Sequence, residues 1–219
     1  MANDTSTTWS WSRAAMSAAG ELAALAQVVC ALPRRRLGVH TLGDADDHPV
    51  PVVLVHGILG DPTNFCILRR HLARNGIRRF SSFAYRPRLD YQRIARNLAA
   101  HIEQVRKETG AAQVDVISHS LGGLVARYFV QTEGGRLVRR LVTLGTPYLA
   151  LHNPAQELAV FGADDTLVPP PRDKVRRRIR VIEGCGHLRL LTDGRVLDAV
   201  VRHLRPPVWA ANRAADAAA

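Results

Sequence analysis

The sequence VDVISHSLGG, residues 114–123, places a serine between an apolar run and a helical pattern. A tight turn from a strand into a helix holds its central residue in a strained backbone conformation and presents its side chain as a nucleophile. The residues two before and two after this serine must be small, so that the strand and the helix can approach each other. Ser118 and Gly122 meet this demand, although the common motif G-x-S-x-G begins with glycine. The pattern predicts a strand-to-helix turn with Ser120 as a candidate nucleophile.

A glycine-rich turn that serves only packing would have a similar sequence, and the downstream residues distinguish the two interpretations. A serine hydroxyl is a poor nucleophile at neutral pH, so a histidine must accept its proton and a carboxylate must orient that histidine. Two apolar strand patterns follow, and they end in FGADDTLVP (residues 161–169) and IEGCGH (residues 182–187). Ser120, Asp165 and His187 therefore occur in the order of a serine, acid and histidine triad on a parallel sheet.

The acid could be either of two neighbouring aspartates, because successive residues at a strand end point in opposite directions. We favour Asp165, since the pattern D-x-x-V-P turns its carboxylate toward the histidine loop, and Asp164 would then cap the turn. Asp173, in a charged stretch, is expected to be solvated. Of the nine histidines only His187 has the context of a triad base. His119 adjoins the candidate nucleophile, and we expect its side chain to point away across the turn and only to pack.

A second glycine-rich loop, HGILG at residues 56–60, follows the apolar run at residues 51–55. Acyl transfer passes through a tetrahedral intermediate whose negative oxygen must be met by fixed N–H donors. The backbone N–H groups of Ile58 and of Leu121, which begins the helix after Ser120, are the candidates. The loop alone would read equally well as an ordinary glycine turn. Together with the candidate triad, it predicts an oxyanion hole.

Four segments of this chain together resemble a known family: HGILG at 56–60, SHSLGG at 118–123, LGTP at 144–147 and GCGH at 184–187. They resemble the small bacterial triacylglycerol lipases and esterases of the α/β-hydrolase superfamily, of the class 2 lipase type, over about residues 50–204. The resemblance implies Ser120 as nucleophile, with Asp165 and His187 as its partners. It also implies an oxyanion hole at Ile58 and Leu121 and a fatty acyl ester as substrate. We expect no cofactor and no metal.

The rest of the chain alternates between strand and helix patterns, which predicts an α/β-hydrolase fold with a mostly parallel, doubly wound sheet and helices on both faces. Strands are expected at 51–56, 79–84, 113–118, 137–144, 157–162 and 178–183, and helices from Pro62, Asp90, Leu121 and Asp193. Only residues 148–156 separate Pro147 from the strand at 157, so we expect a minimal fold without a lid and little activation by interfaces.

We expect one catalytic domain over residues 50–205. Residues 1–49 would be a polar segment and an Ala-rich helix at 14–31 that leads into it, and residues 206–219 a frayed Ala-rich tail. Packing against the domain is the plainest role for that helix. Lying on a membrane surface or covering the acyl groove are the alternatives.

The chain is strongly basic, with a net charge of +11, and its basic residues are almost all arginines, some of them in scattered doublets and triplets. A nucleic-acid partner would call for a basic stripe with interleaved aromatics or a known binding module, and neither is visible. Arginine-rich surface is the plain interpretation, and peripheral contact with an anionic membrane surface is the alternative. The three cysteines cannot all pair within one chain, and neither a signal peptide nor a membrane span is recognisable. These features favour a cytoplasmic location, with a peripheral position on a membrane surface as the alternative.

The leading hypothesis is a serine esterase or lipase that acts through an acyl-enzyme on acylglycerols or other fatty acyl esters. The same triad would also serve a thioesterase, a lactonase or an acyltransferase, because it determines the acyl-enzyme step and not the leaving group. A ligand-binding homologue without catalysis is the third hypothesis. Labelling of Ser120 by a fluorophosphonate and a panel of acyl donors would separate the three.

Overall fold

The structure, a computed structural model, describes residues 39–41, 48–58, 60–86, 90–147, 156–171 and 179–205. These residues form a seven-stranded sheet in the order β1-β3-β2-β4-β5-β6-β7. The strands are β1 (Val39–Thr41), β2 (Val52–Val55), β3 (Arg79–Phe83), β4 (Val114–His119), β5 (Val138–Leu144), β6 (Glu157–Gly162) and β7 (Ile179–Ile182). β1 runs antiparallel to β3, and all other neighbours are parallel. The predicted helix at 14–31 and the predicted tail at 206–219 lie outside the described residues.

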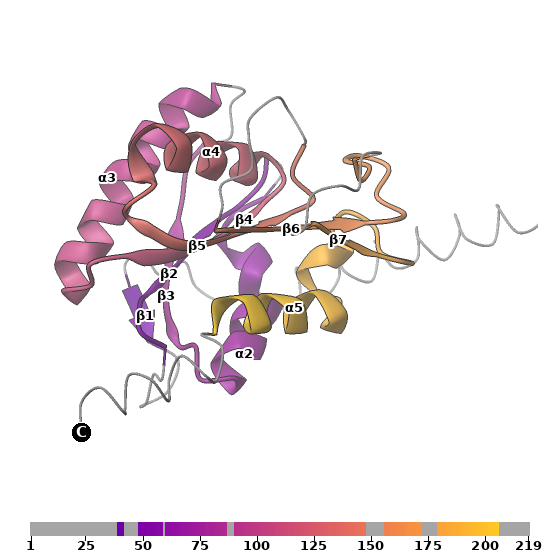
Figure 1. Ribbon diagram of the computed structural model, residues 1–219, viewed down its shortest axis with the longest axis horizontal. Coiled ribbons are helices and arrows are strands. Elements are labelled where there is room, and N and C mark those ends of the chain that lie inside the picture. The colour runs from indigo at the N-terminus through magenta and orange to yellow at the C-terminus, as the bar shows by residue number, and fades with distance from the viewer. Residues whose placement is uncertain are drawn as a thin grey trace, which may run out of the picture.

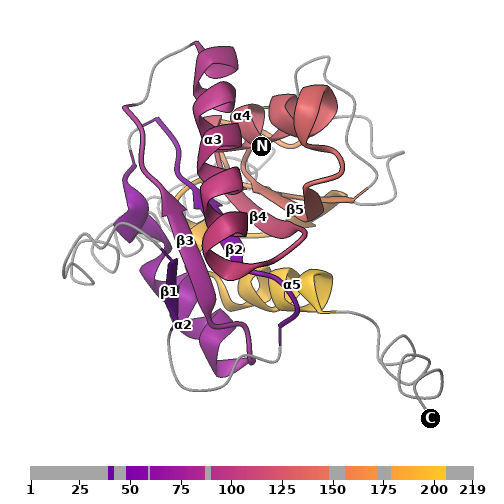
Figure 2. The ribbon, with the colours of Figure 1, turned by 90° about the vertical axis from the view of Figure 1, so that its left-hand side faces the viewer.

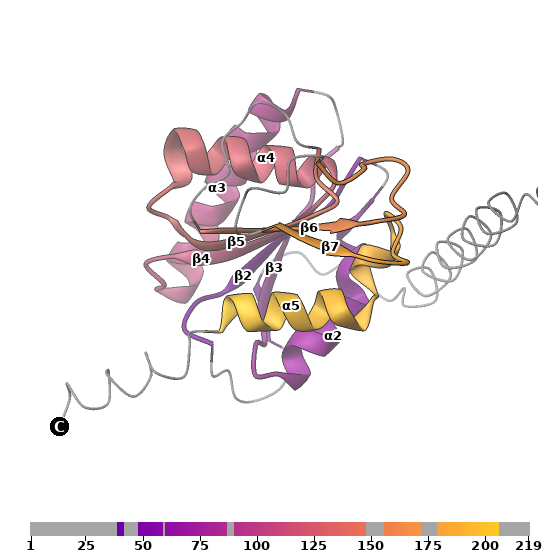
Figure 3. The ribbon, with the colours of Figure 1, turned by 45° about the vertical axis from the view of Figure 1, so that its right-hand side comes forward.

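Helices cover both faces of this sheet. Helices α3 (Tyr91–Thr109) and α4 (Leu121–Phe129) lie on one face, and α2 (Cys66–Arg74) and α5 (Gly194–Leu204) lie on the other (Figure 1 and Figure 3). Figure 2 shows β1 at the outer edge of the sheet, beside β3. This three-layer arrangement confirms the predicted α/β-hydrolase fold.

The alternation of side chains along β2 explains why both faces need helices. Val52 and Leu54 belong to the apolar cluster that includes side chains of α2 and α5, whereas Val53 and Val55 belong to the cluster with α3 and α4. All four are at most 1% exposed. A central parallel strand is buried on both faces, so it is apolar throughout rather than alternating with polar residues.

The elements agree closely with the predicted ranges, with three informative differences. The short strand β1 was not expected, because three residues give too little periodicity. The helix from Pro62 starts as a 3₁₀ turn, where Asp61 caps the Thr63 N–H, before α2 begins at Cys66. The helix after Ser120 ends in a π-helical turn, Val130–Gly134. Asp193 caps α5 as expected.

A buried polar network links the amino-terminal ends of β4 and β5 to each other and to the end of α5. The fully buried carboxylate of Asp115 accepts hydrogen bonds from Arg139 Nε at 3.0 Å and lies 2.7 Å from His48 Nε2. Arg139 also donates to the carbonyl of Leu204, at the end of α5. Arg139 is partly buried and pairs with the buried Asp115, so its role goes beyond the predicted arginine-rich surface. No helix in the described ranges is long and apolar enough to cross a membrane.

Candidate active site

Ser120 occupies the turn between β4 and α4 and is strained there. Its φ of 52° makes it the one non-glycine residue with positive φ among those described, a conformation that costs roughly 1–3 kcal/mol. Hydrogen bonds on both sides hold it: its N–H donates to Leu144 O at 2.9 Å, and its carbonyl accepts from Gly123 N at 3.0 Å and Thr146 Oγ1 at 3.2 Å. The side chain is partly exposed. The predicted turn is therefore present, with its serine held by its surroundings.

Small residues make this turn possible. A Cβ atom on Gly122 would lie 2.4 Å from Val55 O and 2.5 Å from His56 O, so the first turn of α4 contacts the end of β2 directly. Ser118, which replaces the common glycine, is fully buried, and its Oγ donates to Val142 O at 3.0 Å. A serine is thus tolerated there because it is small and its hydroxyl is paired.

The structure brings Asp165 and His187 together. His187 Nδ1 lies 2.7 Å from Asp165 Oδ2, and the other carboxylate oxygen accepts the N–H groups of Leu167 and Val168 at 3.0 and 2.8 Å. A carboxylate only accepts, so Nδ1 carries the proton and Nε2 keeps its lone pair. That tautomer can act as a base. Asp165 also makes the N–H contacts that cap this turn, the role that Asp164 was expected to have.

The prediction that His119 only packs is wrong. Its Nε2 lies 3.2 Å from the backbone carbonyl oxygen of His187, and the two imidazole centroids are 4.6 Å apart. Burial, followed by the nearby His187, lowers the pKa of His119 from 6.5 to about 3. The sequence places His119 beside Ser120, but only the fold shows that the loop after β7 passes over its ring.

The HGILG loop reaches the candidate nucleophile. A Cβ atom on Gly57 would lie 2.9 Å from Ser120 Cβ, so only a residue without a side chain fits between His56 and Ile58. The Tyr85 hydroxyl donates to His56 O at 2.5 Å, and the two rings stack with centroids 4.3 Å apart. Burial raises the pKa of Tyr85 and lowers that of His56. Both rings are therefore uncharged at neutral pH. Tyr85, which follows β3, supports the HGILG loop, and no sequence pattern indicated this role.

The LGTP segment after β5 joins the same edge of the sheet. Thr146 holds the Ser120 carbonyl, and Gly145 lies against the His187 ring, since a Cβ there would come 3.0 Å from Nδ1. The carbonyl of Pro147 accepts a hydrogen bond from the buried Arg127 at 2.9 Å. The LGTP segment therefore contacts both Ser120, the candidate nucleophile, and His187, the candidate base.

Two loops of the candidate site carry exposed apolar side chains. Ile58 is 43% exposed and Leu167 is 71% exposed, and they are the two large exposed hydrophobic side chains of the described residues. Ile58 directly follows Gly57 in the HGILG loop, and Leu167 lies two residues after Asp165. Across the described ranges, no cluster of three or more His, Cys, Asp or Glu side chains could hold a metal ion.

All these residues stand at the carboxyl ends of parallel strands: the HGILG loop follows β2, Ser120 follows β4, LGTP follows β5, Asp165 follows β6 and His187 follows β7. In open α/β sheets ligands bind at this edge. The arrangement offers a candidate nucleophile, a candidate base with an oriented tautomer and candidate N–H donors. These are the components of acyl transfer.

Comparison with known proteins identifies the family of the fold. Residues 50–169 match the model of the α/β hydrolase fold family. Two triacylglycerol lipases, from Pseudarthrobacter phenanthrenivorans and Burkholderia plantarii, are each 32% identical over 108 residues. The match covers 45% of this chain and 33% and 29% of theirs. The chain thus aligns with about a third of the length of these relatives.

Solved structures show the same fold at low identity. A serine hydrolase homologue from Coxiella burnetii superimposes with a TM-score of 0.63 at 16% identity, covering 76% of this chain and 90% of that one. A serine hydrolase without a lid from Xanthomonas campestris gives 0.58 at 18% identity, covering 76% and 84%. With the family match spanning more than half of its residues, the chain belongs to the α/β hydrolase fold family.

Proposed function

We propose that this protein is a serine carboxylic-ester hydrolase that works through an acyl-enzyme. One observation carries the proposal: the strained Ser120 turn and the His187–Asp165 pair occur at the same edge of the sheet, 2.7 Å separating the paired Nδ1 and Oδ2 atoms. Strain of this kind is retained where the surroundings hold it and is frequent at catalytic nucleophiles. The lipase names of the two relatives support the same class.

The proposed reaction follows from the atoms available. Ser120 Oγ attacks the ester carbonyl carbon while His187 Nε2 takes the hydroxyl proton, and Asp165 stabilises the resulting imidazolium. The carbonyl oxygen becomes negative and is met by the N–H groups of Ile58 and Leu121. The C–O bond to the alcohol then breaks, and His187 returns the proton to the leaving oxygen. Water repeats the sequence on the acyl-enzyme and releases the acid.

Exposed apolar side chains on the loops of the candidate site support an apolar acyl group as substrate. Ile58 and Leu167 expose apolar surface on the loops that carry the proposed oxyanion hole and the Asp165 carboxylate, and an acyl chain bound there would cover it. Burial of such surface contributes about 25 cal/mol per Å². We therefore propose fatty acyl esters, acylglycerols among them, as the substrate class. Peripheral contact with an anionic membrane surface is a further element of this proposal, motivated by the charge of +11.

The test is hydrolysis of p-nitrophenyl esters with acyl chains of two to sixteen carbons. We expect activity in the purified protein, a loss of at least about a thousandfold in Ser120→Ala, and fluorophosphonate labelling that this variant abolishes. Ser82→Ala, which changes a buried serine of β3, is the matched control and keeps activity. Full activity in Ser120→Ala would overturn the assignment. Thioester, lactone and acyl-acceptor panels then distinguish the acyl donors that share this triad.

A further inference from the structure

His119 connects the candidate nucleophile to the candidate base. It precedes Ser120 directly in the chain, and its side chain reaches the His187 backbone 68 residues further on. Its ring lies 4.6 Å from the His187 ring, centroid to centroid, at an interplanar angle of 46°. The residue is only 4% exposed. One side chain therefore touches both the backbone and the imidazole of His187.

The hydrogen bond determines how His119 must be protonated. A backbone carbonyl oxygen only accepts, so His119 Nε2 carries a proton and donates it to His187 O. The ring needs no second proton for this contact. A charged ring at this place would lie against the imidazolium that forms on His187 during attack, and like charges at such a distance repel. A neutral His119 holds the loop without opposing that charge.

We propose that His119 is a positioning residue, whose Nε2–H bond to the His187 carbonyl holds the loop of the general base at a set distance from the Ser120 turn. The inference rests on the proposed serine mechanism. His187 has two tasks in that mechanism, to take the proton of Ser120 and to protonate the leaving alcohol. A loosened His187 loop would weaken both transfers, and the second matters only when the leaving oxygen needs a proton.

Two leaving groups make this role measurable. A p-nitrophenolate leaves without protonation, whereas an alkoxide from an ethyl or glycerol ester must be protonated as it leaves. A loss of general structure lowers the fraction of active enzyme and reduces both rates by the same factor. A displaced His187 lowers kcat/KM for alkyl esters more than for p-nitrophenyl esters of the same acid. The ratio of the two therefore separates positioning from folding.

The experiment compares His119→Phe, which keeps a flat ring without the donor, with His119→Gln, which places an amide N–H near the Nε2 position. We expect His119→Phe to lose about tenfold more kcat/KM on the ethyl ester than on the p-nitrophenyl ester. His119→Gln should recover most of this ratio. Fluorophosphonate titration counts the active sites in each preparation. If phenylalanine prevents folding, His119→Leu, which also lacks the donor, is measured in its place.

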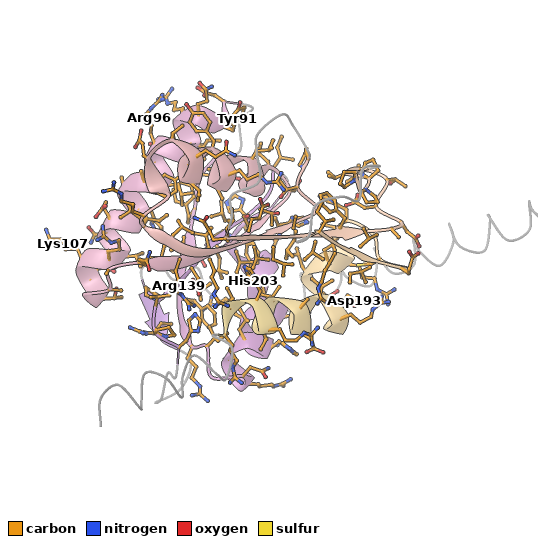
Figure 4. All side chains as sticks on the ribbon, in the orientation of Figure 1. Tyr91, Arg96, Lys107, Arg139, Asp193 and His203 are labelled. Carbon is orange, nitrogen blue, oxygen red and sulfur yellow. The ribbon has the colours of Figure 1, made fainter. Side chains whose placement is uncertain are left out.

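His203 provides the matched control. Its Nε2 lies 3.1 Å from the Gln156 carbonyl oxygen, a contact of the same type. Figure 4 shows it at the opposite end of α5 from Asp193. His203→Phe should leave the ratio of the two esters unchanged. An equal loss on both esters in His119→Phe, or no loss on either, would overturn the inference while Ser120→Ala remained inactive. Activity in Ser120→Ala would instead overturn the proposed function.

Discussion

Single residues of this protein have strained backbone conformations and shifted pKa values at the edge of the sheet that carries the candidate active site. Ser120 takes a positive φ that an ordinary turn would assign to glycine. Its N–H and carbonyl are both occupied, so the strain is held by hydrogen bonds to Leu144, Gly123 and Thr146. None of these hydrogen bonds uses the side-chain hydroxyl. The order of residues in the sequence indicated this serine, and the hydrogen bonds explain how its conformation is sustained.

His119 also predicts how stability depends on pH. Its pKa is about 3 in the folded protein and returns to about 6.5 on unfolding, because burial and the neighbouring His187 disfavour the charged form. Between these values the unfolded chain binds a proton that the native chain does not. The contribution of the neutral His119 to the free energy of unfolding is therefore fully present above about pH 6.5. It falls as the pH is lowered, by up to about 1.4 kcal/mol per pH unit.

Urea unfolding at pH 7 and pH 4.5 measures this effect. Between these two pH values the protein should lose about 2 kcal/mol more than His119→Phe, which has no proton to gain. The groups that act on His119 are His187 and His56, which lower its pKa, and Asp165, which raises it. All three are present in both proteins. Identical losses in the two proteins would contradict the prediction.

Buried charged side chains link helices to strands in this protein, and no local sequence pattern predicts which charged residues do so. Arg127 of α4 is 1% exposed, and its guanidinium donates to Glu157 at the start of β6 and to the Pro147 carbonyl. Thr143 of β5 also donates to Glu157. Helix α4, two strands and the LGTP segment thus share one network. Arg127 appears in the sequence as one arginine among many, because its partners are distant along the chain.

This network predicts an asymmetry between single and double substitutions. Arg127→Met leaves the Glu157 carboxylate buried without its charge partner and should cost about 3–5 kcal/mol of unfolding free energy. Adding Glu157→Leu removes the isolated charge and should recover most of that loss. Urea unfolding of the single and double variants measures it. Arg106→Met, at the more exposed Arg106–Glu103 pair, should cost under about 1 kcal/mol. Additive losses in the double variant would contradict the prediction.

Elements with strong local signals were predicted well. Strand β2 is a continuous apolar run, VVLV, and caps such as Asp193 mark helix starts. The range predicted for β6 is the observed one, and β4 differs by one residue at each end. Strand β1 was missed, since its pairing with β3 and not its own pattern makes it a strand. Short edge strands depend on such long-range contacts.

At the scale of the whole molecule, the connection between β5 and β6 bears on how substrate enters. It spans residues 145–156, and those of its residues that are described form no helix. The absence of a lid therefore remains a prediction from chain length. An open site would not need an interface to uncover it. We predict that activity on a short-chain triacylglycerol rises smoothly as its concentration passes the solubility limit.

Titration of released acid across that limit provides the measurement. Leu167→Ser is a useful companion, because Leu167 is the most exposed large apolar side chain of the described residues. If Leu167 contacts acyl groups directly, the variant should lose activity toward long chains while activity toward acetyl esters is kept. A sharp rise at the solubility limit would contradict the prediction and indicate a covering segment.

The sequence by itself determined the class of the fold and indicated the candidate reactive residues. Apolar runs, caps and small residues around a serine are local properties, because they depend on the sizes and polarities of adjacent residues. The choice of Asp165 over Asp164 also followed from strand-end spacing, and the structure brings Asp165 to His187.

Only the tertiary structure decided what surrounds those residues. His119 faces His187, Tyr85 holds the carbonyl of His56, and Arg127 reaches Pro147, each across a long stretch of chain. Such contacts depend on which strands become neighbours and on how closely loops approach. These are properties of the assembled sheet, because the sequence pattern of one segment does not determine which other segment will lie beside it.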